Sequence, residues 1–306
     1  MPKALLCLPL VLFGFLVVVE AQSGSSRQPT FKSSASVVTI QASVRTSGGR
    51  PLRGLTSADF EVLDNGQPRS ILSLSDTQAS LTLALLVDTS GSMAGGVKLG
   101  MVQHAFDSVL PHLRQGRDEA SVFAFDSGLR QLRPFTSDPA SLRSALQEIE
   151  PYGTTSLYDA TAAAARALAD RTSTHKAILL FTDGTDTSSR LDAAGVSALA
   201  SSVGVPVYVV VAVPPVDQRT MAETSESRTT STGTDLRHLA DWTGGLLVFA
   251  TNQEEMTKSA SRVMDELRHQ YVLAIEPATA REWRRLEVRV LRRAAIVRAR
   301  SGYFGG

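Results

Sequence analysis

Residues 81–92 read LTLALLVDTSGS, and residues 177–184 read AILLFTDG. Each stretch is a short apolar run that ends in an aspartate, Asp88 in the first and Asp183 in the second. Runs of this length without alternation of apolar and polar residues are typical of strands that are covered on both faces. A third run of this kind lies at residues 205–213. The three stretches therefore predict the central strands of a parallel sheet.

Helical periods lie between the apolar runs. One apolar stripe joins Met101, Ala105, Val109 and Leu113, and further helices are expected at residues 157–168, 193–203 and 253–268. Shorter apolar segments at residues 120–126, nearer an edge of the sheet, and at 245–249 predict additional strands. Alternation of strand and helix along the chain predicts an α/β fold, a Rossmann-like, doubly wound and mostly parallel sheet with helices on both faces.

Both flanks of this region have the alternating pattern of half-buried strands. The N-terminal strands are expected at residues 37–44, 59–63 and 70–74, and the C-terminal ones at 271–275, 286–290 and 295–299. Because chain ends often lie close in space, we expect the two β segments to pack together beside the α/β domain. The predicted division is a signal peptide at 1–21, a β segment at 22–77, an α/β domain at 78–268 and a second β segment at 269–306.

The composition is that of a globular protein. The chain has 306 residues, of which 43% are apolar and 20% charged, and the 31 basic residues nearly balance the 30 acidic ones. A net charge of +1 gives no global field that would attract nucleic acid. Arginines are dense after residue 280, but Glu287 and Arg289 alternate with Val288 and Val290 as on a strand with one solvated face. We therefore expect no nucleic-acid partner, the alternative being a local patch for nucleic acid or phospholipid.

The N-terminus resembles a secretory signal peptide. Lys3 precedes an apolar run at residues 4–19, and the small residues Val19 and Ala21 precede a cleavage point after residue 21. The run is shorter than the roughly 20 residues of a membrane-spanning helix, which favours a cleaved signal peptide. A membrane anchor that is retained is the alternative. We expect an exported protein, periplasmic or secreted, that touches a membrane only if this segment is retained. Removal of the segment also removes Cys7, the only cysteine.

The two aspartates that end apolar runs predict a metal site. Ligands of open parallel sheets gather at the carboxyl ends of the strands, so the carboxylates of Asp88 and Asp183 are expected to converge. Their repulsion is relieved by a divalent cation. Ser90 and Ser92, two residues apart in a tight loop, and Thr155, before another helix, offer hydroxyl oxygens. Hard oxygen donors with few carboxylates, completed by water, describe an octahedral magnesium-type site.

These motifs resemble a known family. Asp88-x-Ser90-x-Ser92, the stretch TSLYDA at 155–160 and FTDG at 181–184 resemble the metal-ion-dependent adhesion site (MIDAS) of von Willebrand factor type A (VWFA) domains, over about residues 80–265. Residues 54–66 and 300–303 resemble the VWFA-related proteins of acidobacteria. The resemblance implies that Ser90, Ser92 and Thr155 coordinate Mg²⁺ or Mn²⁺ through hydroxyls, and that Asp88 and Asp183 hold it directly or through water. Thr154 is the alternative to Thr155, which is preferred because its distance to Ala160 matches the family spacing.

The resemblance implies binding rather than catalysis. In the family, an Asp or Glu of a protein partner completes the metal's coordination shell, so we expect an adhesion or assembly module and no enzyme. The sequence contains no Gly-x-Ser-x-Gly elbow, no phosphate-binding loop motif and no His-x-x-x-His pair. The alternatives are a metal-dependent hydrolase and a metal-free envelope scaffold. A polar stretch at 214–234 is expected to be a long loop that either forms a partner-selecting rim at the metal or is a tolerant insertion. Nothing in the sequence predicts an oligomeric state.

Overall fold

The computed structural model describes residues 37–76, 79–94, 96–147, 149–213, 226–292 and 295–305, and for residues 226–232 the backbone alone. The predicted signal peptide with Cys7, residues 214–225 of the predicted loop, and Arg293 of the arginine-rich end lie outside these ranges. In the described part of the chain, none of the helices combines the length and the hydropathy that a membrane-spanning segment needs.

The centre of the fold is a six-stranded sheet, in the order β10-β9-β8-β5-β6-β7. The strands are β5 (Leu81–Asp88), β6 (Glu119–Phe125), β7 (Leu129–Thr136), β8 (His175–Thr182), β9 (Val207–Ala212) and β10 (Leu247–Ala250). All neighbouring pairs are parallel except β6 and β7, which are antiparallel. The structure thus confirms the predicted α/β class and its mostly parallel sheet.

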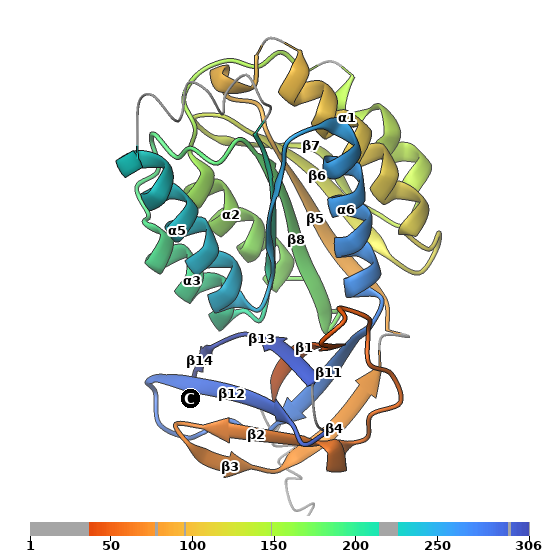
Figure 1. Ribbon diagram of the computed structural model, residues 1–306, viewed down its shortest axis with the longest axis vertical. Coiled ribbons are helices and arrows are strands. Elements are labelled where there is room, and N and C mark those ends of the chain that lie inside the picture. The colour runs from red at the N-terminus through yellow and green to blue at the C-terminus, as the bar shows by residue number, and fades with distance from the viewer. Residues whose placement is uncertain are drawn as a thin grey trace, which may run out of the picture. The chain divides into compact units, whose positions relative to one another are not determined.

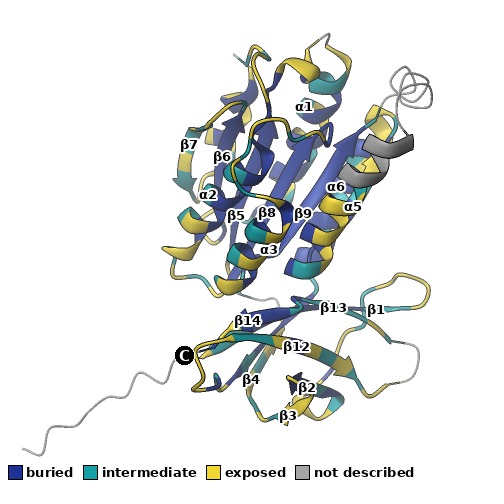
Figure 2. Cartoon of the chain, turned by 90° about the vertical axis from the view of Figure 1, so that its left-hand side faces the viewer, coloured by how far each residue is buried: buried dark blue, intermediate teal, exposed yellow. Residues whose placement is uncertain are grey.

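Helices cover both faces of this sheet (Figure 1). They are α1 (Val97–Val109), α2 (Leu157–Ala169), α3 (Ala193–Ser202), α5 (Glu226–Thr243) and α6 (Gln253–Leu267). The apolar sides of α1 and α6 share one core with residues such as Leu85 and Leu179, and α2, α3 and α5 share a second core with Leu86 and Leu180. Consecutive strand residues point to opposite faces and both faces are covered, so β5 and β9 are buried at every residue and β8 at every residue except Lys176 (Figure 2).

Two further sheets contain strands from both ends of the described chain. One has the order β13-β1-β11-β4 and the other β14-β12-β2-β3. The strands are β1 (Val38–Thr46), β2 (Phe60–Asp64), β3 (Gln67–Arg69), β4 (Ile71–Asp76), β11 (Gln270–Ile275), β12 (Trp283–Val290), β13 (Ala295–Ala299) and β14 (Gly302–Phe304). Their inward residues form one core, in which the rings of Phe60 and Tyr271 meet edge to face. We call these two sheets the β unit.

Two elements of the α/β unit differ from the prediction. The strand expected at residues 120–126 does lie near an edge of the sheet, as β6, but the edge strand itself is β7, which the sequence did not predict. In β7 half-buried residues mix with exposed ones, so no apolar run marks it in the sequence. The expected loop at 214–234 is also wrong from residue 226 onward, where α5 begins. Thr, Ser and Gly disfavour a helix there, but Leu236, Leu239 and Ala240 are buried against the second core and hold it.

The α/β unit and the β unit are joined by buried polar contacts. Glu266, near the end of α6 and 1% exposed, pairs with Arg45 of β1 and Arg298 of β13, and accepts a hydrogen bond from the Tyr208 hydroxyl. Trp242 of α5 and Trp283 of β12 stack, with ring centroids 5.9 Å apart. These side chains come from segments far apart in the sequence, so folding of the β unit and of the helices is coupled.

Candidate metal centre

The first predicted ligand, Asp88, is the last residue of β5 and is fully buried. Its Oδ1 accepts a hydrogen bond from the backbone N–H of Ser90 at 2.9 Å. Its Oδ2 accepts a second one from the hydroxyl of Thr182, the last residue of β8, at 2.6 Å. Since β5 and β8 are neighbouring parallel strands, these bonds fix the carboxylate at the point where both strands end.

The two serines lie together in the turn after β5. The chain bends through a short 3₁₀ turn at Gly91–Met93, which places the hydroxyl oxygens of Ser90 and Ser92 3.1 Å apart. Magnesium binds oxygen ligands octahedrally at about 2.1 Å, so neighbouring ligands lie about 3 Å from one another. The spacing of the serine oxygens therefore fits two adjacent positions around such an ion.

Thr155 lies in a loop that backbone bonds fasten to the serine turn. The N–H of Gly91 donates to the carbonyl of Gly153 at 3.0 Å, and a Cβ on Gly91 would lie 3.3 Å from that oxygen, so the loops touch closely. Gly153 itself has φ +82°, a conformation that favours glycine. Thr155 is 3% exposed, and its own N–H donates to the hydroxyl of Thr187 at 2.9 Å. Its position is thus set through the backbone.

Asp183 follows β8 and faces a cation that belongs to the chain. The ammonium of Lys98, the second residue of α1, lies 3.0 Å from Asp183 Oδ2 and also donates to the carbonyl of Ser92 at 3.2 Å. Asp183 is 6% exposed, and the next residue, Gly184, has φ +95°, which lets the chain turn sharply after the carboxylate. The lysine therefore links two of the three loops that carry the predicted ligands.

In the absence of a cation, the surroundings of Asp88 disfavour the ionised form of its side chain. Burial raises the pKa of Asp88 to about 6, the hydrogen bonds from Ser90 and Thr182 lower it in part, and the nearby charge of Asp183 raises it again. A cation at the site favours the ionised form of Asp88 because it supplies the opposite charge.

The donor set present fits a hard divalent cation. Two carboxylates and three hydroxyls stand on three loops tied by hydrogen bonds, and two of the hydroxyl oxygens already have the spacing of metal ligands. Across the described ranges, no group of three or more His, Cys, Asp or Glu side chains could hold a metal. A cation here would therefore depend on neutral hydroxyl oxygens for three of its five protein ligands, which suits magnesium-type coordination.

Two residues of the site were missed from the sequence. Thr182 orients Asp88, and Lys98 is bound to Asp183, but each acts through a tertiary contact with a residue more than eighty positions away. The only signal for Lys98 was its place at the start of a helix, six residues after Ser92. No local pattern distinguishes such a lysine from a solvated one.

The acidic residues nearest the site, Asp186 and Asp126, accept hydrogen bonds from neighbouring backbone amides. Asp186 accepts hydrogen bonds from the backbone N–H of Tyr158, in the first turn of α2, and from Ser189. Asp126 accepts a hydrogen bond from the N–H of Gly128 at 3.1 Å.

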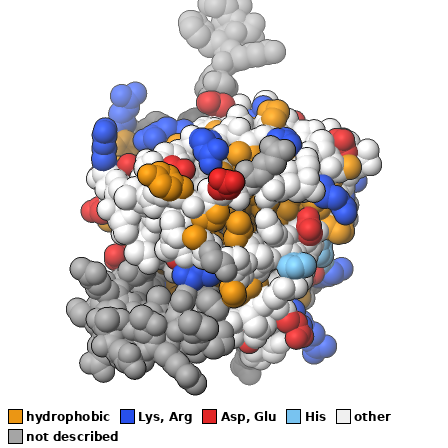
Figure 3. Space-filling model, turned by 90° about the horizontal axis from the view of Figure 1, so that it is seen from above, with side chains coloured by type: hydrophobic (Ala, Val, Ile, Leu, Met, Phe, Trp, Pro, Cys, Tyr) orange, Lys and Arg blue, Asp and Glu red, His pale blue; other side chains and the backbone are white. Residues whose placement is uncertain are grey.

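Viewed from above (Figure 3), hydrophobic side chains are exposed near the middle of the molecule and charged side chains of both signs lie around them.

Comparison with known proteins gives a family and a fold. Residues 83–185 match the family model of the von Willebrand factor type A domain. The VWFA structure from Catenulispora acidiphila is similar, with 14% identity and a TM-score of 0.52 over 90% of this chain and 76% of that one. Proximal thread matrix protein 1 of the mussel byssus, solved with a zinc-occupied MIDAS motif, has 16% identity and a TM-score of 0.51 over 66% and 48% of the two chains.

A further solved structure and the search of curated proteins complete the comparison. BatB from Bacteroides thetaiotaomicron has 19% identity and a TM-score of 0.47 over 61% of this chain and all of that one. No curated protein matches the chain in sequence. The matched residues 83–185 span β5 to β8 and include every predicted metal ligand. Over residues 83–185 the chain therefore matches the von Willebrand factor type A domain, and its α/β fold is that of the similar solved structures.

Proposed function

We propose that this chain binds a protein partner through a divalent cation, Mg²⁺ or Mn²⁺, held by Asp88, Ser90, Ser92, Thr155 and Asp183. VWFA domains are a family of protein-interaction modules, some of which carry a MIDAS. The observation that carries the proposal is the pair of serine hydroxyls, 3.1 Å apart, beside the buried carboxylate of Asp88. An Asp or Glu of the partner would complete the coordination shell.

The charge of the donor set supports this role. When bound, the cation supplies an electrophilic position for an anionic oxygen. Three of its five protein ligands are neutral hydroxyls, so the two carboxylates at most cancel its charge. A carboxylate from outside is then a better ligand than water, because its anionic oxygen is attracted to the cation more strongly than a neutral oxygen is. The same reasoning favours Asp or Glu over a neutral side chain of the partner.

The surroundings of the site support binding rather than turnover. Among the described residues, the groups that contact the five predicted ligands are hydroxyls, backbone amides and the ammonium of Lys98, and none is a histidine. His175 begins β8, whereas Asp183 follows its last residue, so the length of the strand separates them. A hydrolase would need a general base close to the reacting oxygen.

Metal identity and location are part of the proposal. The mussel protein holds zinc in its MIDAS motif, so zinc belongs among the metals to be tested beside Mg²⁺ and Mn²⁺. Export to the periplasm or medium rests on the sequence of residues 1–21, and the division of the chain at residues 22–77, 78–268 and 269–306 is likewise proposed.

Calorimetry on metal-free protein tests the site. We expect the wild type to bind Mn²⁺, and we expect a Ser90→Ala/Ser92→Ala double variant to bind it at least about tenfold more weakly because two ligand oxygens are lost. The matched control is Ser141→Ala/Ser144→Ala, which removes two exposed hydroxyls elsewhere. Equal affinity in all three proteins would contradict the proposal and favour a metal-free scaffold.

The open coordination position is tested with Mn²⁺-loaded protein. Acetate should reduce the water relaxation caused by the bound ion, because it displaces water from manganese, whereas ethylamine at the same concentration should not. An unchanged relaxation with acetate would mean that no position is free for a partner's carboxylate. A partner captured from the native envelope should then be released by EDTA.

A further inference from the structure

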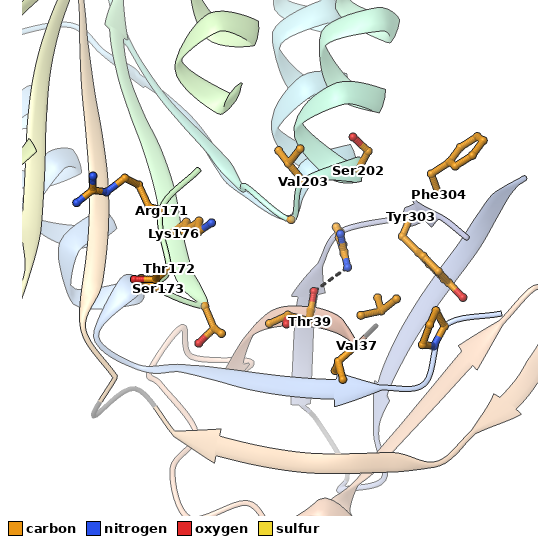
Figure 4. A pocket seen from close by; sticks show the side chains of 15 residues that line it. Val37, Thr39, Arg171, Thr172, Ser173, Lys176, Ser202, Val203, Tyr303 and Phe304 are labelled. Carbon is orange, nitrogen blue, oxygen red and sulfur yellow. Dashed lines mark hydrogen bonds between the residues drawn. The ribbon is translucent and has the colours of Figure 1, made fainter. Parts of the chain in front are cut away.

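A pocket of about 400 Å³ lies far from the metal centre along β8. Lys176, the second residue of that strand, lines the pocket, whereas Asp183 follows the strand's other end. Other walls come from residues 171–174 before β8, from β1, from the end of α3 and from β14 (Figure 4). The volume is within the range of small-molecule sites, about 300–1,000 Å³.

The charges that line the pocket are all positive. Arg171, Lys176 and Arg300 contribute to its wall, and none of its described lining residues is an Asp or Glu. Arg171 has a carboxylate partner outside the pocket, Glu119, at 2.7 Å. Lys176 donates to a carbonyl, that of Ala169, and burial lowers its pKa. The pocket therefore concentrates positive charge that the protein only partly compensates.

Arg300 is the least compensated of the three. It is 7% exposed, and its guanidinium donates to two carbonyls, those of Ser201 and of Thr39, the second bond being the dashed line in Figure 4. Within the described residues it makes no ion pair, and its buried Nε has no hydrogen-bond partner. Burial lowers the pKa of Arg300 to about 10. A buried charge without a counter-charge is unfavourable, so an anion in the pocket would stabilise it.

The rest of the wall limits the kind of anion. Thr172 and Thr174 add hydroxyl groups, which donate hydrogen bonds to oxyanions. Val37 and Phe304 are about half exposed, at 47% and 58%, and give the pocket an apolar side. In Figure 4 the side chains of Arg171 and Lys176 lie on one side of the pocket and those of Tyr303 and Phe304 on the other. One end of a ligand would thus be anionic and the other apolar.

We propose that this pocket binds a small organic oxyanion, a phosphate monoester or a carboxylate on an apolar group, with Arg300 and Lys176 as its counter-charges. The site is independent of the metal centre, and its occupant would contact both the start of the central sheet and the β unit.

Calorimetry with three probes tests the proposal. Phenyl phosphate and benzoate represent the two oxyanions, and benzyl alcohol has the apolar group without the charge. We expect at least one of the two anions to bind and the alcohol to bind at least about tenfold more weakly, because charge-assisted hydrogen bonds are lost. Stronger binding of phenyl phosphate identifies a phosphate monoester as the ligand class, and stronger binding of benzoate a carboxylate. Absence of binding by both anions, or equal binding by the alcohol, overturns the proposal.

Variants locate the site. Arg300→Met should weaken anion binding about tenfold or more, and Lys176→Met about threefold or more. The Arg300 guanidinium also donates hydrogen bonds to two backbone carbonyls, so Arg300→Met can prevent folding. In that case Lys176→Met is the variant that tests the site. Lys258→Met, which removes an exposed ammonium on α6, is the control and should leave affinity unchanged. An unchanged affinity in folded Lys176→Met protein, or an equal loss in the control, would also overturn the proposal.

Discussion

At Lys98 the chain places a positive charge of its own beside the predicted metal ligands. The ammonium pairs with Asp183, and both side chains are largely buried, at 16% and 5% exposure. A metal ion that binds Asp183 must therefore share the carboxylate with this lysine or displace it. Without metal, the lysine compensates the charge of one of the two carboxylates in the cluster, and it lowers the affinity of the cluster for metal.

Lys98→Met should therefore tighten metal binding. We expect about a fivefold gain in Mn²⁺ affinity, because a partly buried ion pair is worth on the order of 1 kcal/mol. Calorimetry on metal-free protein measures the change, with Lys98→Arg as the control that keeps the charge. Weaker binding in Lys98→Met would show instead that the lysine holds Asp183 in place for the metal.

His175 makes stability depend on pH. Its ring is fully buried, Nε2 lies 3.2 Å from the Gln270 side-chain oxygen, and burial lowers its pKa from 6.5 to about 4. The nearby charges are Arg268, Asp118 and Arg114. Since the unfolded chain takes up a proton on this histidine more readily, the stability is fully present above pH 6.5 and declines as pH falls toward 4. The full effect is on the order of 3 kcal/mol.

Urea unfolding across this pH range tests the effect. His175→Gln removes the titrating group, so the difference in unfolding free energy between wild type and variant should shrink as pH falls. A difference that stays constant from pH 6.5 to pH 4 would mean that folding does not lower the pKa of His175.

The candidate ligands were predictable because each stands directly after an apolar run or before a helix. Asp88 and Asp183 follow strands whose burial is visible in the sequence, and Ser90 and Ser92 share a turn with one of them. Thr182 and Lys98 were not predictable, because their roles depend on which loops the fold brings together.

At the scale of elements, Asp118 ties the α1 side of the sheet together. It is 1% exposed, and its carboxylate accepts hydrogen bonds from Arg114, from Arg268 at the end of α6, and from the N–H of Leu81 at the start of β5. Burial alone would raise the pKa of Asp118, but the two arginines hold it well below the usual range.

Asp118→Ala should destabilise the fold by about 3 kcal/mol, since it leaves buried donors without their acceptor. Glu119→Ala is the matched control: Glu119 forms a half-exposed pair with Arg171, for which about 1 kcal/mol or less is expected. Chemical denaturation measures both. Similar losses in the two variants would mean that the buried network contributes no more than a surface pair.

The elements that the sequence did not predict show what local pattern leaves out. The central strands were found because burial on both faces requires an apolar residue at nearly every position. β7 is an edge strand with half its surface in water, so its sequence is mixed. Helix α5 is polar in composition, and only the spacing of Leu236 and Leu239 marks its buried side. Both depend on packing against partners distant in sequence.

At the scale of the molecule, the N- and C-terminal strands complete one another. β1 pairs with β11 and β13, and β2 pairs with β12, so the β unit cannot form from either end alone. Glu266 joins this unit to α6 through two arginines. The alternating pattern of both flanks predicted strands, but it contained no information on which strands pair.

Glu266→Gln should weaken the connection between the units. We expect a loss of about 3 kcal/mol in unfolding free energy, because Arg45 and Arg298 lose a buried counter-charge while the shape is kept. Glu254→Gln, on the exposed side of the same helix, should change stability by less than about 0.5 kcal/mol. Differential scanning calorimetry distinguishes the two, and a wild-type transition in Glu266→Gln would contradict the expectation.

The stacked indole rings of Trp242 and Trp283 are the chain's two tryptophans, one in each unit. The two rings lie close enough for their electronic transitions to couple. The near-ultraviolet circular dichroism and the intrinsic fluorescence of the protein therefore report directly on the contact between the α/β unit and the β unit. Any event that parts the two, whether a ligand, a partner or mechanical load, is thereby visible without an added dye.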